Sequence, residues 1–260
     1  MPDEPKHPSS QFVQSFAKGL SVIRTFGPGA GSMTLSQVAE RSGLPRAGAR
    51  RLLLTLQELG YVVFDGKNFS LTPKIMDLGY SYLSSMELWD LAEPFLAGVS
   101  ERLDETTSAA VLDGPDIVYV VRVPTHRLIS NALSIGTRLP AHATSLGRVL
   151  LGALSDDELD RYLRTTKLEQ FTQKTTTDPD ELRAAVRADH SKGWSWVADQ
   201  LEDGLCGVAV PIRRRDSAVI AAINISTRPV RGSMAAVRKR LLPELRVVAE
   251  QIEAALKLRA

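Results

Sequence analysis

Two short helical patterns joined by a glycine-containing turn constrain this chain more than any other feature. Residues 34–37 (TLSQ) match a capping box, in which Thr34 and Gln37 satisfy each other's backbone groups at a helix start. Gly43 then allows a tight turn, and Pro45 is expected at the first position of a second helix that ends near Leu59. Two short helices with this connection are the signature of a helix-turn-helix.

The segments on either side extend this motif into a winged helix. Upstream, apolar residues recur at steps of three and four, which is typical of an amphipathic helix: Phe12, Phe16, Leu20, Ile23 and Phe26. Downstream, the apolar runs 61–64 and 69–72 flank Asp65-Gly66, which predicts a β-hairpin. Thr72-Pro73 then opens a further helix. This order of elements is that of a winged helix-turn-helix with a connecting helix.

The remaining two thirds of the chain alternate strand and helix patterns. Strands are expected at 107–112, 117–122, 129–135, 194–198, 208–213 and 219–226. Helices are expected after Thr144, after Ser155, over 179–192 and from Met234 to the end. Because hairpins mix with helices, we predict an antiparallel α+β domain rather than a doubly wound one. The expected organisation is a disordered leader (1–11), a winged helix-turn-helix (12–73), a linker helix (74–88) and a large α+β domain (89–260).

Composition excludes several kinds of site. The single cysteine, Cys206, cannot form a disulfide within the chain or a multi-cysteine zinc site, and the four histidines show no metal-binding spacing. We therefore expect no metal and no other cofactor. The leader lacks the apolar segment of a signal peptide, and no uncharged apolar run reaches membrane-spanning length, so we expect a cytoplasmic protein without a membrane partner. With a net charge of +2, any nucleic-acid contact must come from a local basic surface.

The helix that begins at Pro45 carries such a surface. At about 100° per residue, one arc of this helix collects the apolar residues Ala49, Leu52, Leu53 and Leu56. The opposite arc collects Arg46, Ala47, Arg50 and Arg51 near the helix start, where recognition helices meet base edges. Arginine can bind guanine O6 and N7 with two hydrogen bonds, or it can bind a phosphate.

The alternative for this basic arc is a solvated helix face, which is what most charged helix faces are. The preceding turn and the hairpin tip with Lys67 and Asn68 favour DNA binding instead. The predicted partner is double-stranded operator DNA. The predicted DNA-contacting set is Ser36, Arg46, Ala47, Arg50, Arg51, Lys67 and Asn68.

Five segments resemble the IclR family of bacterial transcriptional regulators. They are 14–20 (QSFAKGL), 43–47 (GLPRA), 56–61 (LQELGY), 136–148 (GTRLPAHATSLGR) and 204–211 (GLCGVAVP). Residues 121–125 (VRVPT) and 136–148 are most similar to the branch that controls catabolism of protocatechuate, p-hydroxybenzoate and β-ketoadipate. The resemblance implies a GAF-like effector-binding domain over 89–260, a homodimer often paired into a tetramer, and control of a nearby operon as activator or repressor.

A helix start in the C-terminal domain suits an anionic ligand. Thr144 and Ser145 open a helix whose unpaired N–H groups and hydroxyls, with nearby His142, can bind a carboxylate. Ordinary helix capping and a structural histidine are the alternatives for these residues. The same domain offers guanidinium partners, and the sequence does not show which of them point inward: Arg122, Arg127, Arg138 and Arg148.

The resemblance implies further walls for the same binding site. They are the segment 199–206 and the last strand, where Asn224 and Ser226 share a face. This sequence departs from the family pattern, which has a longer acidic stretch before the glycine corresponding to Gly204 and an arginine where Cys206 stands. A lone cysteine beside a strand is more often a small buried hydrophobic residue than a redox or metal group. The predicted effector-binding set is Gly136, His142, Thr144, Ser145, Arg148, Asp199, Cys206, Asn224 and Ser226.

These features together predict a DNA-binding regulator, not an enzyme, that is modulated by a small aromatic or dicarboxylic acid. Alternatives are a repressor with a non-aromatic effector, a C-terminal enzyme, and a nucleoid-type protein without an effector. The sequence holds no GxSxG, HxxxH or phosphate-loop motif, and architectural proteins seldom carry so large a further domain. Because one winged helix contacts few base pairs, we expect a homodimer or a dimer of dimers, with the apolar face of 74–86 as its seam.

Overall fold

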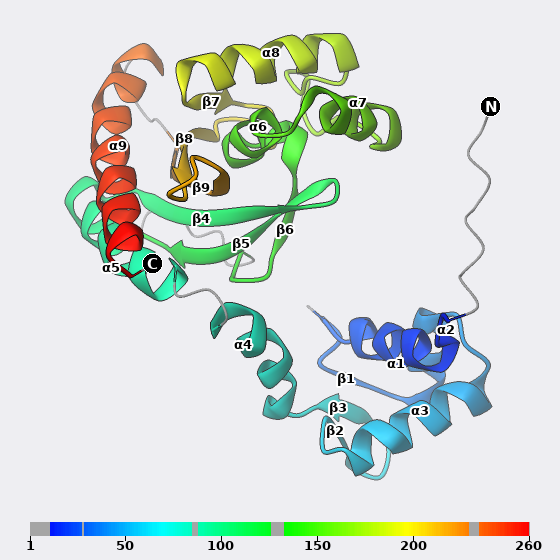
Figure 1. The fold of residues 1–260 in the computed structure, drawn as a ribbon. Helices are drawn as coiled ribbons and strands as arrows, with labels where there is room; N and C mark the ends of the chain where they lie inside the picture. Colours follow the sequence, from blue (N-terminus) through cyan, green and yellow to red (C-terminus); the bar gives the residue numbers. More distant parts are fainter. Residues whose placement is uncertain (1–10, 28, 85–87, 126–132, 229–233, 260) are drawn as a thin grey trace. The chain divides into compact units, whose positions relative to one another are not determined.

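The computed structural model describes residues 11–27, 29–84, 88–125, 133–228 and 234–259 (Figure 1). Residues 1–10 of the predicted leader lie outside this range. The chain divides into two compact units, Met1–Ser85 and Met86–Ala260, and each is described by itself. Among the described helices, none combines the length and the apolar character that a membrane span requires.

The first unit is a winged helix-turn-helix. Its three strands form an antiparallel sheet in the order β1-β3-β2, next to helices that share one apolar core. The core includes Val22, Met33, Val38, Leu53 and Phe69. The elements are α1 (Gln14–Thr25), β1 (Ser32–Met33), α2 (Leu35–Ser42), α3 (Arg46–Glu58), β2 (Val62–Phe64), β3 (Phe69–Leu71), η1 (Pro73–Ile75) and α4 (Met76–Ser84).

Local capping explains where the two central helices begin and end. The predicted capping box is present, because the Thr34 side chain accepts from the Gln37 N–H while the Gln37 side chain accepts from the Thr34 N–H. Gly43 ends α2 with φ at 66°, a conformation that glycine adopts without strain. Pro45 is the N-cap of α3 rather than its first helical residue. Strand β1 was not predicted, since two residues are too few to show an alternating pattern.

The second unit is a six-stranded antiparallel sheet with helices on both faces (Figure 1). The strand order is β6-β5-β4-β9-β8-β7, so the predicted α+β class is confirmed. Helices α5 and α9 pack together on one face, and α6 packs on the other face with α8 beside it. The elements are α5 (Leu88–Leu103), β4 (Thr106–Asp113), β5 (Asp116–Val123), β6 (Arg138–Pro140), η2 (Ala141–Ala143), α6 (Ser145–Gly152), α7 (Asp156–Thr165), α8 (Pro179–Lys192), β7 (Ser195–Ala198), β8 (Cys206–Arg213), β9 (Val219–Thr227) and α9 (Met234–Arg259).

Two parts of the second unit differ from the sequence prediction. No strand forms over 133–135, the described part of the predicted strand 129–135; a turn closed by Thr137 N–H to Ser134 O occupies this place, and the strand is β6 instead. Helix α5 was not predicted, because Pro94 stands in its interior, where proline disfavours a helix. Burial of the apolar face that includes Leu96 and Val99 outweighs this preference.

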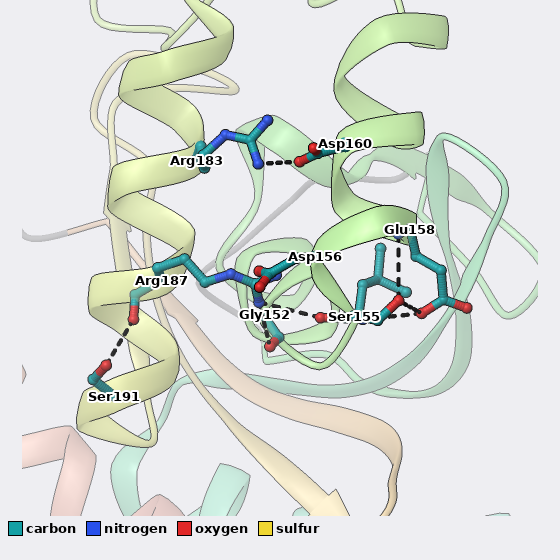
Figure 2. Close-up of polar contacts among 9 residues, drawn as sticks. Gly152, Ser155, Asp156, Glu158, Asp160, Arg183, Arg187 and Ser191 are labelled. Atoms are coloured by element: carbon teal, nitrogen blue, oxygen red, sulfur yellow. Dashed lines mark hydrogen bonds and ion pairs between the residues drawn. The ribbon is translucent and has the colours of Figure 1, made fainter.

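Helix α6 is fixed at both ends. At its C-terminal end, Arg187 of α8 donates to the carbonyl oxygens of Gly152 (3.2 Å) and Leu154 (3.1 Å) and pairs with Asp156 (2.6 Å; Figure 2). A cation at this end also interacts favourably with the helix dipole. At the other end, a Cβ atom added to Gly147 would overlap the backbone of Ala141. The absence of a side chain therefore lets the first turn of α6 lie directly against η2.

The contact at Gly147 predicts a loss of stability on substitution. Gly147→Ala should lower the free energy of unfolding by about 1–3 kcal/mol or more, because two backbone segments must separate to admit a methyl group. Gly98→Ala is the matched control: it lies inside α5, its nearest neighbour is the flexible end of Arg102, and it should stabilise by up to about 1 kcal/mol. Urea unfolding followed by tryptophan fluorescence reports on the second unit alone, which holds all three tryptophans. Equal stability of the two variants would contradict this account.

Candidate functional site

The N-terminal half of α3 presents a basic surface. Arg46, Arg50 and Arg51 are exposed together with Ala47, while Ala49, Leu53 and Leu56 on the opposite arc are buried. Arg46 Nη1 donates to the Ser36 hydroxyl of α2 at 3.1 Å, so the two helices of the motif are joined on their exposed side. The structure thus brings Ser36 and the arginine arc onto one surface of the first unit.

The wing is a short hairpin held by one carboxylate. The side chain of Asp65 accepts from the N–H groups of Asn68 (2.7 Å) and Lys67 (2.8 Å), and these hydrogen bonds hold its pKa below the usual value. Gly66 takes φ at 99°, which suits the tight turn. As a result the Lys67 side chain is exposed at the tip, and Asn68 is half-buried beside it.

A cavity of about 230 Å³ opens in the second unit. Its walls come from the start of α6, the central strands, and the segment 200–205 that precedes β8. The lining is mainly apolar, with a few polar groups and the charged side chains of Arg122, Glu202 and Arg228. The lining residues are Tyr119, Arg122, Leu133, Leu139, Ala143, Thr144, Ser145, Leu146, Val197, Gln200, Leu201, Glu202, Leu205, Cys206, Gly207, Asn224, Ser226 and Arg228.

Five members of the predicted effector-binding set meet at this cavity. Thr144 caps α6 by accepting from the Gly147 N–H at 3.1 Å, which leaves the Ser145 and Leu146 N–H groups without a partner inside the helix. On β9, Asn224 Nδ2 donates to the Ser226 hydroxyl at 2.9 Å. The fifth member is Cys206 on β8.

Two buried oxygen atoms at the floor of this region lack hydrogen-bond partners. They are Asn224 Oδ1 and Ser108 Oγ, and their residues are directly opposite each other in the β4–β9 pairing. Asn224 is only 4% exposed and lines the cavity. An unsatisfied buried polar atom is costly, so a ligand group that donates a hydrogen bond to Asn224 Oδ1, such as a hydroxyl, gains binding energy.

The remaining predicted residues lie outside the cavity wall. Gly136 forms a turn with φ at 85°, and its N–H donates to the Tyr119 carbonyl oxygen at 2.8 Å. Asp199 accepts from Lys174 Nζ (2.6 Å) and from the Gly204 N–H (2.7 Å), and both bonds hold its pKa below the usual value. These hydrogen bonds fix the backbone turn at Gly136 and tie Asp199 to Lys174 and Gly204.

His142 and Arg148 lie behind the start of α6. The Nε2 atom of His142 is 3.0 Å from the carbonyl oxygen of Glu169, and burial lowers the pKa of this histidine, so the neutral ring is favoured. Arg148 is buried, and its guanidinium group donates to three neutral oxygens rather than into the cavity. The alternative of a structural histidine fits this arrangement.

The other candidate arginines have different surroundings. Arg122 lines the cavity, with its guanidinium carbon 5.6 Å from the centre of the Tyr119 ring. Arg138 pairs on the surface with Asp113 (2.6 Å) and Asp116 (3.1 Å), and Arg127 lies outside the described residues. Sequence reasoning missed Arg228, which lines the cavity and pairs with Glu202 at 2.5 Å.

Cys206 is not poised for thiolate chemistry. Its Sγ atom is 3.5 Å from Met234 Sδ, and burial raises the pKa of the thiol to about 11. The thiol therefore stays protonated near neutral pH, and Cys206 behaves as a small buried hydrophobic residue. In the part of the chain that the structure describes, no group of three or more His, Cys, Asp or Glu side chains could hold a metal ion.

Comparison with known protein families matches nearly the whole chain. Residues 15–66 match the IclR helix-turn-helix domain, and residues 80–254 match the bacterial transcriptional regulator IclR C-terminal domain. The first matched segment contains helix α3, and the second contains the cavity described above.

Individual relatives agree with this assignment. The Pca regulon regulatory protein of Pseudomonas putida is 43% identical over 90% of this chain and 81% of its own length. The p-hydroxybenzoate hydroxylase transcriptional activator of Acinetobacter baylyi is 32% identical over 94% of this chain and 92% of its own length. The crystal structure of an IclR homolog from Microbacterium hydrocarbonoxydans, complexed with 4-hydroxybenzoate, matches with a TM-score of 0.83 and 26% identity over 94% of this chain and 99% of that one. The resemblance seen in the sequence is confirmed: the chain belongs to the IclR family of bacterial transcriptional regulators.

Proposed function

We propose that this transcriptional regulator binds an aromatic carboxylate in the 230 Å³ cavity and that the bound ligand changes its affinity for operator DNA. The observation that carries the proposal is the meeting of the α6 start with the polar face of β9 at one mainly apolar cavity. The cavity is smaller than a typical drug-sized site, which suits a single ring with short substituents. Family members are regulators rather than enzymes, as the sequence predicted.

The polar groups at the cavity suit the carboxylate end of such a ligand. The Ser145 and Leu146 N–H groups carry the positive end of the α6 dipole, and they bind an anion without burying another full charge. The Ser145 hydroxyl and the Asn224 amide lie close together, because a Cβ atom on Gly207 would be 2.6 Å from Ser145 Oγ and 3.7 Å from Asn224 Nδ2. Both side chains therefore border the same part of the cavity.

The comparisons support an aromatic ligand of this size. The relative from Microbacterium hydrocarbonoxydans was solved with 4-hydroxybenzoate, and the relative from Acinetobacter baylyi is named as the transcriptional activator of p-hydroxybenzoate hydroxylase. In this chain the ring would contact the apolar lining, which includes Tyr119, Leu139 and Leu146.

DNA recognition is assigned to the basic surface of the first unit. Arg46, Arg50 and Arg51 are exposed on the first turns of α3, where a recognition helix meets the major groove. Lys67 at the wing tip is placed to contact the phosphate backbone, which supplies affinity without sequence selectivity.

A second copy of this chain is the proposed occupant of the exposed apolar face of α4. Met76 is 72% exposed, and Tyr80, one helical turn later on the same face, is 70% exposed. Such a cluster on so short a helix is unfavourable in water unless another surface covers it. Two copies also give the two half-sites that a winged helix needs for specific binding.

The DNA assignment predicts two distinct mutant phenotypes. Arg50→Ala should weaken binding to an operator selected from random duplexes by about 1–3 kcal/mol, with little effect on unrelated DNA, because a base contact is lost. Lys67→Ala should weaken binding to both DNAs alike and reduce the salt dependence by about one phosphate contact. Arg214→Ala, which removes an exposed arginine of the second unit, is the control. Gel-shift titrations in which Arg50→Ala keeps full affinity and selectivity would refute the assignment.

The assembly proposal predicts that charge on α4 dissociates the protein. Met76→Glu and Tyr80→Glu should shift sedimentation from dimer to monomer at micromolar concentration, since each places a charge in an apolar seam. Ser81→Glu adds the same charge at a polar position of the same helix and should leave the dimer intact. A wild-type protein that sediments as a monomer at micromolar concentration would contradict the proposal.

The ligand proposal predicts that the variants differ in ligand affinity, measured by calorimetric titration with 4-hydroxybenzoate, protocatechuate and β-ketoadipate. Ser145→Ala and Asn224→Ala should each weaken binding of an aromatic acid about tenfold, the effect of losing one hydrogen bond to a charged group. Ser191→Ala removes a hydroxyl of α8 outside the cavity and serves as the control. Equal affinities in all four proteins would place the site elsewhere, and binding of β-ketoadipate alone would exclude the aromatic class.

A further inference from the structure

Arg148 is an unusual buried residue. It is only 4% exposed, and its guanidinium group donates to the carbonyl oxygen of His142 (Nε, 3.1 Å), the hydroxyl of Thr176 (Nη2, 3.1 Å) and the side-chain oxygen of Gln200 (Nη2, 3.0 Å). All three acceptors are neutral. Arginine nevertheless keeps its proton inside proteins, so a full positive charge is held here.

This charge has no carboxylate partner in the described part of the chain. No Asp or Glu oxygen there lies within 4.0 Å of its guanidinium nitrogens. The Asp189 carboxylate acts on Arg148 through space and favours its charged form, but it makes its own contacts with the Ser195 hydroxyl (2.7 Å) and Lys192 Nζ (3.4 Å). A buried charge that lacks a counter-charge is strongly destabilising.

The wall between this charge and the cavity is one side chain thick. Gln200 lines the cavity, and its side-chain oxygen accepts from Arg148, so this one residue contacts both. The Thr175 hydroxyl donates to the backbone carbonyl of Gln200 at 2.6 Å, and the Thr176 N–H donates to its side chain at 3.4 Å. Gln200 is thereby held in place between Arg148 and the cavity.

The two arginines that line the cavity directly are less available to a ligand charge. Arg228 pairs with Glu202 at 2.5 Å and also donates to the Asp203 carbonyl oxygen. The guanidinium group of Arg122 lies over the Tyr119 ring. Glu202 offsets Arg228, and the Tyr119 ring covers one side of Arg122, so Arg148 is a further guanidinium charge behind the α6 start that has no carboxylate within 4.0 Å in the described residues.

We propose that Arg148 is a buried counter-charge that strengthens the preference of this cavity for an anionic over a neutral ligand, and that it acts through Gln200 without touching the ligand. The inference rests on the proposed carboxylate site and assigns its charge selectivity to a positioning residue behind the wall. Charges separated by a few ångströms in a water-poor site interact more strongly than in solvent, and salt screens them little.

The experiment compares two probes of nearly the same shape, 4-hydroxybenzoate and its neutral analogue 4-hydroxybenzamide. The readout is the ratio of their affinities by calorimetry, which a general loss of structure would not change selectively. The wild type should prefer the anion. Arg148→Met should reduce the ratio about tenfold or more, whereas Arg148→Lys, which keeps the charge, should retain most of it. Arg138→Gln removes an equal charge from the surface and should leave the ratio unchanged.

A second variant keeps the test decisive if Arg148→Met does not fold. Gln200→Glu supplies Arg148 with a carboxylate partner, so it should raise the melting temperature of the unliganded protein and lower the same ratio. The inference would be overturned if Arg148→Met kept the wild-type ratio of affinities for the two probes, or if Arg148→Lys and Arg148→Met reduced that ratio equally. A lower melting temperature of Gln200→Glu would also overturn it. A wild type that binds neither probe would instead show that the proposed function is wrong, and the inference would fall with it.

Discussion

The close approach of α6 to η2 is the constraint on which the ligand cavity depends. It requires Gly147, because any side chain there would overlap the backbone of Ala141. The same approach places the α6 start over Gly207, where a side chain would collide with Ser145. Two glycines on different elements thus bring the helix N-terminus and the polar face of β9 to one point. Arg187 then holds the other end of α6, so the helix is fixed along its length.

Charge is distributed around this helix in a consistent way. The partial positive charge of the α6 start faces the cavity, Arg148 adds a full charge behind the wall, and Glu202 on the opposite side is occupied by Arg228. Under the proposed function, the α6 dipole and Arg148 would favour an anionic ligand without a direct ion pair between the ligand and Arg148. Regulation then requires only that the ligand bind two states of the protein with unequal affinity, since equal affinity shifts no equilibrium.

The sequence predicted those parts of the structure that local chemistry determines. Capping residues marked the starts of α2, α6 and α7, and the Asp65-Gly66 pair marked the wing. Alternating polar residues placed Asn224 and Ser226 on one face of a strand. The sequence could not show that the Arg148 guanidinium group donates to neutral oxygens rather than into the cavity, nor that Gln200 and Arg228 line the cavity. Those facts depend on contacts between segments far apart in the chain. Helix α5 was not predicted either, because burial of its apolar face against other parts of the chain outweighs the effect of Pro94.

The central claim is that occupancy of the cavity changes DNA affinity, and one coupled titration tests it most directly. Operator affinity of the full-length wild type is measured by fluorescence anisotropy with and without saturating 4-hydroxybenzoate, and the pair of titrations is repeated with Asn224→Ala at the same ligand concentration. The account predicts a change of about fivefold or more in the wild type, the usual range of allosteric coupling, and a much smaller change in the variant. An operator affinity that does not respond to the ligand in the wild type, or that responds equally in both proteins, would contradict it.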